Sequence, residues 1–327
     1  MEVLVNRPLT MYKEQKAKYP DFFNRIEVIN KRPNAFWLKE GCYCPTMFGV
    51  VYFEQKRHRN LNESTPDEDL DDSLALTTAL TWGKAKFTYN FDDDLTAELI
   101  EQARDNINVS SRMVKLPVWC IYVRINDAVL DGMYIRWEVD MARRYEKELL
   151  IIPVRRDGTL ENFKHLSIPR VPKLLSELLE EQWKNILEPT DIDEKVKENY
   201  WKRDCDIIKF ALNVVLYLTS ANSDIVEKTN GGAHKPGEET GIRVFSVGEN
   251  IGERLREFHL KHPRYPKTGD GGHHKSPVMH IRNAHWHTYL YGKGKKERRI
   301  TWQAPIIVMN TGEEIDVVTI THVKKEE

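Results

Sequence analysis

Cysteine is scarce in this chain, with only four among 327 residues, and no stretch is apolar enough to cross a membrane. Cys42 and Cys44 are separated by one residue, a spacing too tight for an easy internal disulfide. Secreted chains of this size more often pair their cysteines, so we expect a reducing cytoplasm. The longest apolar run, Ile207–Leu218, is interrupted by Lys209 and Asn213. It is far shorter than the roughly 20 residues of a membrane span, so we expect no membrane partner.

Net charge is also nearly absent, because 49 Lys and Arg offset 50 Asp and Glu to leave −1 at pH 7. This balance argues against a nucleic-acid-binding protein that works through its overall charge, although it permits a local basic face. The apolar share of 40% and the aromatic share of 10% indicate a folded chain rather than a disordered one. The length suggests about two domains.

The sequence signatures of several enzyme classes are missing. It contains no Walker phosphate loop, no Rossmann fingerprint and no Gly-x-Ser-x-Gly nucleophile elbow. Cys42 and Cys44 lack the second cysteine pair that a structural zinc site would use. No repeat of fixed period is present, which excludes solenoids and propellers.

The first part of the chain has mainly helical patterns. Met11–Val28 carries apolar residues at helix-like spacing, and Pro20 marks the start of a second helix within it. Phe48–Phe53 is either a strand or the start of a buried helix. Glu63–Asp72 holds six acidic residues and no basic one, which predicts a solvated loop. Aspartates at its start predict a capped helix over Asp94–Asn106.

Three strands follow in the middle of the chain. Leu116–Ile125 is dense in β-branched and aromatic residues, and Gly132–Met141 alternates as a half-buried antiparallel strand should. With Glu148–Val154, this spacing predicts an antiparallel meander rather than βαβ units. Two helices are then expected, an amphipathic one over Leu174–Leu187 and a buried one over Asp204–Leu218.

The last part of the chain combines a helix with strands. Val247–His259 predicts the helix, and the Gly-Lys-Gly-Lys sequence between Ala284–Tyr291 and Glu297–Trp302 predicts a β-hairpin. Ile306–Met309 and Val317–His322 are two further expected strands.

These elements predict an α+β fold of mixed helices with an antiparallel sheet, ending in a helix plus β-hairpin unit. We expect an N-terminal α+β region over 1–222, a loop or linker over 223–240, and a basic, histidine-rich module of helix and strands over 241–327.

Positive charge is concentrated in this C-terminal module. The window Arg254–Arg299 holds 12 Lys and Arg against 3 Asp and Glu, a net charge of +9, so the rest of the chain sums to −10. Seven of the eleven histidines lie between His259 and His287. A cationic module on an acidic body is expected to bind an anionic partner, either RNA or an acidic protein surface.

The histidines of the module permit two kinds of chemistry. On a strand, His285 and His287 project to one face and Trp286 to the other. Together with His280 they could hold zinc, or they could act as a base and acid in phosphodiester cleavage. The motif contains no Cys and no clear carboxylate ligand, and nothing supplies an in-line nucleophile. A hydrogen-bonded surface pair is the simpler interpretation, so no cofactor is expected.

A third interpretation is recognition. Aromatic residues alternate with basic ones on the hairpin, an arrangement that holds single-stranded RNA through stacking and charge. The same surface suits an extended peptide added at a sheet edge. Alternatively, the aromatic rings simply pack on the core. The residues concerned are Trp286, Tyr289, Tyr291 and Trp302 with Arg282, Lys293, Lys295, Lys296, Arg298 and Arg299.

The segment His280–Asn310 closely resembles the C-terminal signature of a type V-A anti-CRISPR family, its second subtype, which phages and other mobile elements carry. Val244–Phe258 resembles the helix that precedes this signature, and Leu116–Val123 resembles the central strand of the family. Fainter similarities lie at Leu216–Leu218 together with Asp224 and Ile225, and at Ile29–Phe36. The resemblance covers most of the chain, and its C-terminal motif is the specific part.

The resemblance implies a function. Members of the family lower the amount of the type V-A effector nuclease by engaging its nascent N-terminal segment during translation, after which its mRNA is degraded. The implied protein is not an enzyme: it works in the cytoplasm of a bacterial host, with the nascent chain, and the ribosome or mRNA beside it, as partners. A histidine- or metal-dependent ribonuclease, or an RNA-binding regulator, is the alternative. The residues expected to meet the partner are His280, Arg282, His285, Trp286, His287, Tyr289, Arg298, Trp302, Glu253, Arg254 and Trp119.

Overall fold

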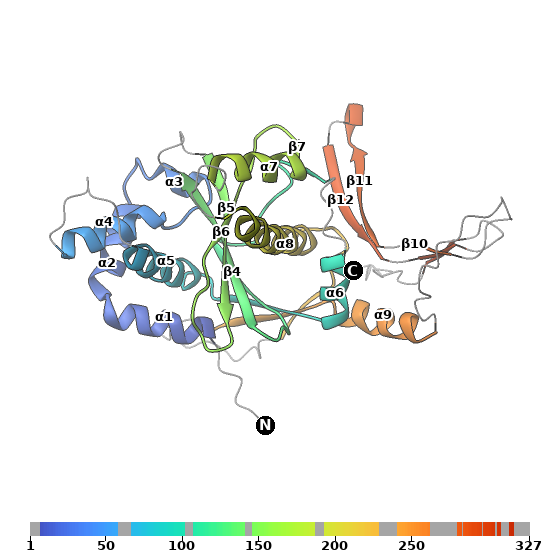
Figure 1. Ribbon diagram of the computed structural model, residues 1–327, viewed down its shortest axis with the longest axis horizontal. Helices are drawn as coiled ribbons and strands as arrows, with labels where there is room; N and C mark the ends of the chain where they lie inside the picture. Colours follow the sequence, from blue (N-terminus) through green and yellow to red (C-terminus); the bar gives the residue numbers. More distant parts are fainter. Residues whose placement is uncertain are drawn as a thin grey trace, which may run out of the picture.

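A seven-stranded mixed sheet forms the centre of the molecule (Figure 1). The computed structural model describes residues 7–57, 67–101, 107–140, 146–186, 193–228, 241–261, 280–282, 284–295, 297–304, 306–308 and 314–316. In spatial order the strands are β6 (Lys164–Ser167), β5 (Glu146–Arg155), β4 (Leu130–Asp140), β3 (Cys120–Arg124), β1 (Phe87–Phe91), β9 (Arg243–Val247) and β8 (Ile225–Glu227).

The predicted antiparallel meander is confirmed, but it is only half of the sheet. Strands β3 to β6 pair antiparallel with their neighbours, whereas β1 lies parallel to both β3 and β9. The expectation that Gly132–Met141 would be half-buried is wrong: from Met133 to Val139 every residue of β4 is buried, since helices cover both faces. β9 follows β1 by about 150 residues, so local spacing could not reveal their pairing.

The N-terminal helices cover one face of the sheet. Tyr12 and Trp82 pack there on Tyr122 and Tyr134 of the central strands. Pro20 begins a second helix, as predicted, and Phe48–Phe53 is helical rather than extended. The helices are α1 (Arg7–Lys18), α2 (Pro20–Asn30), α3 (Phe36–Lys39), α4 (Thr46–Lys56) and α5 (Asp67–Trp82).

The acidic run differs from its prediction as a solvated loop. From Asp67 onward its residues form the first turns of α5. Asp69 is fully buried there and forms an ion pair with Arg57, which directly follows α4. Because Arg57 supplies the missing charge, a carboxylate that could not be buried alone can join the core.

The opposite face of the sheet carries the helices of the second half. Leu95 and Leu99 from α6 (Asp93–Glu101) pack into this core with the buried side of α8 (Glu194–Leu218). Helix α7 (Leu175–Ile186) and α9 (Glu249–Lys261) lie beside them. The expected buried helix is therefore confirmed, but it starts at Glu194, ten residues before the prediction. No helix within the described ranges is long and apolar enough to cross a membrane.

Asp92 and Asp224 hold α6 and α9 at the carboxyl ends of the parallel strands. Asp92 caps α6, as expected, since its Oδ1 accepts the Asp94 N–H at 2.9 Å, and Arg256 of α9 binds its other oxygen at 3.0 Å. Asp224 accepts the N–H of Asn250 at 2.8 Å and so caps α9 from the strand side. These bonds satisfy N–H groups that a helix end leaves unpaired.

Shorter strands complete the described structure. The predicted hairpin is confirmed as β11 (His285–Tyr291) and β12 (Glu297–Gln303), joined by the short helix η1 (Lys293–Lys295). Strand β13 (Ile306–Val308) lies between β10 (His280–Arg282) and β14 (Glu314–Asp316), and β2 (Asn108–Val109) pairs with β7 (Lys173–Leu174). The expected strand at Val317–His322, and residues 229–240 of the expected linker, lie outside the described residues.

A buried arginine joins the N-terminal helices to the sheet. Arg136 of β4 has no exposed surface, and its Nη2 lies 3.1 Å from an oxygen of Glu138 on the same strand. The guanidinium also donates to the Cys44 carbonyl at 3.2 Å and to the Thr46 hydroxyl at 2.7 Å. Glu138 in turn accepts the Thr46 N–H at 3.0 Å, at the start of α4. Burial lowers the pKa of Arg136, but the Glu138 carboxylate and nearby thiols reverse this, so its pKa is raised.

Replacing Arg136 should lower the free energy of unfolding by more than the loss of a single hydrogen bond would. In Arg136→Met the Glu138 carboxylate stays buried without its partner, so we expect a loss of about 3–5 kcal/mol in the free energy of unfolding, measured in urea. The double variant Arg136→Met with Glu138→Gln removes the uncompensated charge and should lose less than Arg136→Met alone. Equal losses in both variants would show that charge burial is not the cause.

Alkaline pH should destabilise the fold. Burial raises the pKa of the Cys42 and Cys44 thiols, and that of Cys120 to about 12. Burial raises the pKa of five buried tyrosines in the same way: Tyr52, Tyr89, Tyr122, Tyr134 and Tyr217. The unfolded chain releases the thiol protons above about pH 9 and the phenol protons above about pH 10, while the folded chain keeps both. The free energy of unfolding must therefore fall as pH rises, by about 1.4 kcal/mol per pH unit for each group that the unfolded chain has released.

Urea unfolding at several pH values between 8 and 10.5 measures this slope. Cys120→Ala removes one thiol, so the free energy of unfolding should fall less steeply with pH between pH 9 and 10. The difference in slope should correspond to nearly one proton. A free energy of unfolding that stays level across this range would contradict the prediction.

Candidate recognition surface

The β11–β12 hairpin has two chemically different faces. His285 pairs with Gln303, Trp286 with Trp302 and His287 with Thr301. Because side chains alternate along a strand, the histidines share one face and Trp286 points to the other, as predicted. Figure 1 shows the turn end of the hairpin pointing away from the central sheet.

Trp302 anchors the hairpin through its inner face, the face that carries Trp286 and Trp302. Its side chain is 1% exposed and meets the Tyr217 ring of α8 edge to face, with 5.7 Å between the ring centres. Asn222, just after α8, donates to the Trp302 carbonyl at 2.5 Å and accepts the Trp302 N–H at 3.1 Å. The expectation that Trp302 would contact a partner is therefore wrong, because the indole belongs to the core and holds the hairpin in place.

A second asparagine fixes the other strand. The Trp286 indole donates to Asn213 Oδ1 at 3.0 Å, and the Asn213 amide donates to the Leu99 carbonyl of α6 at 2.9 Å. Asn213 is buried, so both of its polar atoms need these partners. The half-buried Trp286 thus ties β11 to α8 and α6, and its N–H is already used. In the sequence Asn213 only interrupts an apolar run, and nothing indicates this role.

The outer face carries the exposed ring pair. His287 and Tyr289 lie two residues apart on β11, and their ring centres are 4.1 Å apart at an interplanar angle of 47°. Both are exposed, Tyr289 at 47%. His285 continues the row and is half-buried. Such a row of exposed rings on an anchored strand is typical of an interaction surface.

Three other expected residues lie on nearby strands. Arg298 is on β12 opposite Leu290, while His280 and Arg282 are on β10, which pairs with β13 in a different sheet from the hairpin. In the part of the chain that the structure describes, no three His, Cys, Asp or Glu side chains come together to hold a metal ion.

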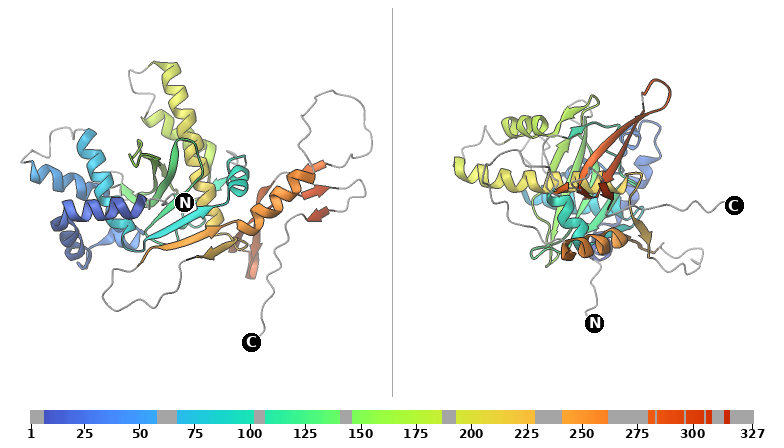
Figure 2. Two further views of the ribbon diagram at one scale, coloured as in Figure 1. Left: turned by 90° about the horizontal axis from the view of Figure 1, so that it is seen from below. Right: turned by 90° about the vertical axis from the view of Figure 1, so that its right-hand side faces the viewer.

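The remaining expected residues are divided between two places. Glu253 and Arg254 are exposed on α9, which lies at the same end of the molecule as the hairpin (Figure 2). Trp119 instead meets the ring of Tyr43 at 5.7 Å, in the connection between α3 and α4. These helices lie at the other end of the molecule (Figures 1 and 2), so the structure does not bring Trp119 to the hairpin.

Comparisons with known proteins agree with this fold. The model of the AcrVA2-like family, described as the anti-CRISPR type V subtype A2 family, matches residues 89–309. A solved structure, described as the crystal structure of AcrVA2, superposes with a TM-score of 0.58 at 16% sequence identity, over 92% of this chain and 98% of that one. No curated protein sequence matches the chain. At this identity the structural likeness shows the fold alone.

The family match begins inside β1 and ends just after β13, so it includes the hairpin, α8 and α9. Because it spans well over half of the chain, the protein belongs to the anti-CRISPR type V subtype A2 family.

Proposed function

We propose that this protein lowers the amount of a type V-A effector nuclease by binding the nascent N-terminal segment of that nuclease during translation, which triggers degradation of its mRNA. Membership of the anti-CRISPR family supports the target system. The proposed setting is the cytoplasm of a bacterium that carries a phage or another mobile element. In this proposal the protein is a recognition trigger without an active site of its own, and host ribonucleases cleave the message.

The observation that carries the proposal is that the β11–β12 hairpin has free strand edges and is held in place by contacts with the core. Within the described residues β11 and β12 pair only with each other, so each strand has one edge without a neighbouring strand. An extended peptide can add to such an edge through main-chain hydrogen bonds, with alternate side chains reaching the row of His287 and Tyr289. Since Trp302 and Trp286 anchor the hairpin beforehand, little ordering is left to oppose binding.

A second candidate uses the same face. The window around the hairpin has a net charge of +9, and His285 and His287 share one side of β11. These features favour an RNA partner, either for binding or for histidine-based cleavage. Purified protein that cleaves RNA, with loss of cleavage in His285→Ala, would establish this candidate in place of the first.

The first prediction of the proposal concerns translation. When the protein is expressed beside a type V-A nuclease gene, we expect the nuclease transcript to fall, as measured by quantitative reverse-transcription PCR. The same gene without its start codon produces the transcript but no peptide, so its level should stay unchanged. A fall in both transcripts would contradict nascent-chain recognition and favour direct action on RNA.

The second prediction concerns the outer face of the hairpin. His287→Ala with Tyr289→Ala should weaken capture of ribosomes bearing the nascent nuclease by about 5- to 30-fold, because exposed ring contacts of this kind contribute about 1–2 kcal/mol in total. Tyr200→Ala is the matched control, since this tyrosine is also exposed, at 62%, but lies on α8. Capture in a pull-down is the measurement.

The variant Asn222→Ala distinguishes the anchoring of the hairpin from direct contact between its outer face and the partner. It removes the bonds to Trp302 without touching the outer face, so it should reduce capture and also lower the melting temperature. His287→Ala with Tyr289→Ala should leave the melting temperature within a degree or two. Undiminished capture by that double variant would exclude the outer face as the binding surface.

A further inference from the structure

The two outer edges of the β11–β12 hairpin are not equivalent. In an antiparallel pair, residues that exchange both main-chain hydrogen bonds alternate with residues whose N–H and C=O groups point away from the partner strand. Trp302 is of the second kind, because Asn222, which is not on β11, accepts its N–H at 3.1 Å and donates to its carbonyl at 2.5 Å. Trp286 lies opposite Trp302, so its main-chain groups also point away from the partner strand.

Three residues of β11 share this orientation. Because the pattern repeats every second residue, Trp286, Thr288 and Leu290 all direct their N–H and C=O groups to the outer edge of β11. None of these main-chain groups has a hydrogen bond to another described residue. On the β12 edge, by contrast, Asn222 already occupies Trp302. In Figure 1, β12 lies on the side of the hairpin toward α8, and β11 lies on the other side.

The β11 edge also lacks the residues that keep an edge strand from pairing. Lysines, other charged residues and proline commonly protect such edges. The β11 sequence, His-Trp-His-Thr-Tyr-Leu-Tyr, contains no Lys, Arg, Asp, Glu or Pro, whereas β12 begins with Glu-Arg-Arg. Tyr289 and Leu290, which project to opposite faces beside this edge, are 47% and 52% exposed. Such a strand is suited to pair with another extended segment.

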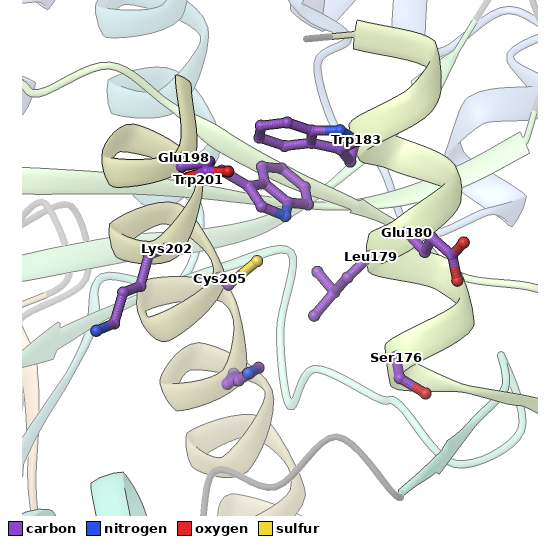
Figure 3. A pocket seen from close by; sticks show the side chains of 9 residues that line it. Ser176, Leu179, Glu180, Trp183, Glu198, Trp201, Lys202 and Cys205 are labelled. Atoms are coloured by element: carbon purple, nitrogen blue, oxygen red, sulfur yellow. The ribbon is translucent and has the colours of Figure 1, made fainter. Parts of the chain in front are cut away.

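The cleft between α7 and α8 offers no pairing of this kind (Figure 3). Both of its walls are helices, whose main-chain groups bond within each helix. Its lining includes two glutamates and two lysines, so charge does not select a partner there either. An extended segment therefore finds unpaired main-chain groups at the hairpin rather than in the cleft.

We infer that the partner segment joins the sheet at the β11 edge, through the main-chain groups of Trp286, Thr288 and Leu290. This inference rests on the proposed function, which supplies the occupant: a nascent chain that is still unfolded has main-chain groups free to pair. Segment residues opposite His287 and Tyr289 then lie on the outer face beside these rings. The partner is thus an extended segment with aromatic or β-branched residues at alternate positions, and without proline where its N–H must face β11.

Proline substitution tests the edge without breaking the hairpin. The Thr288 N–H points away from β12, so Thr288→Pro removes no bond between β11 and β12. It should reduce capture of ribosomes bearing the nascent nuclease by about tenfold or more, because the ring removes one main-chain donor and blocks pairing beside it. Thr288→Ala keeps the N–H and should stay within about twofold of the wild type. Ile300→Pro makes the same change on the β12 edge and should also keep capture.

Hydrogen exchange measured by NMR locates the edge without any substitution, and melting temperatures show whether each variant folds. When a synthetic peptide of the nuclease N-terminal segment binds, exchange should slow at the Trp286, Thr288 and Leu290 amides and stay unchanged at the Ile300 amide. Capture kept by a folded Thr288→Pro, capture lost only in Ile300→Pro, or slowed exchange at Ile300 alone would each overturn the inference.

The same measurements distinguish a failure of this inference from a failure of the proposed function. If Thr288→Pro keeps capture while His287→Ala with Tyr289→Ala loses it, nascent-chain recognition stands and the β11 edge is not its route. If the wild-type protein captures no such ribosomes, the proposed function fails and this inference fails with it. A wild-type protein that sediments as a dimer, with Thr288→Pro as a monomer, would show that a second copy occupies the edge, which also overturns the inference.

Discussion

The ion pair of Arg136 and Glu138 is the constraint on which the arrangement of the molecule depends. A guanidinium without exposed surface is stable only when nearly all of its donors have partners, and here those partners come from the α3–α4 connection, α4 and α5. Helices that approached the sheet differently would leave the charge unsatisfied. The pair therefore contributes little net stability compared with apolar packing, but it specifies one orientation of the N-terminal helices.

The other end of the molecule is joined by a different kind of contact. Two asparagines of α8 and its exit, Asn213 and Asn222, hold the hairpin through neutral hydrogen bonds to Trp286 and Trp302. An amide supplies both a donor and an acceptor, so Asn222 replaces the neighbouring strand that Trp302 lacks on this side. The hairpin is thereby fixed to the core through its tryptophans, and its outer face stays available for contact.

The sequence predicts the local elements well and their long-range relations poorly. Pro20, the aspartates before α6 and the Gly-Lys-Gly-Lys turn act over a few residues, and each of them marks its element correctly. The parallel pairing of β1 with β9 joins distant segments, and the burial of Asp69 depends on Arg57 across a helix connection. The composition of the hairpin also misleads at Trp302, because an indole among basic and aromatic residues can equally contact a partner or anchor the hairpin to the core.

The same distinction explains which part of the candidate site could be inferred. Alternation along a strand is a local rule, so the shared face of His285 and His287 follows from the sequence. Whether that face points to solvent is decided by what the opposite face binds, and this depends on Asn213 and Asn222, far away in the chain. Trp119 shows the reverse case: it lies in the segment that resembles the central strand of the family, yet its ring contacts Tyr43 near α3. A recognition surface in this fold must therefore be assembled from contacts across the core, since neither motif nor charge alone places its members together.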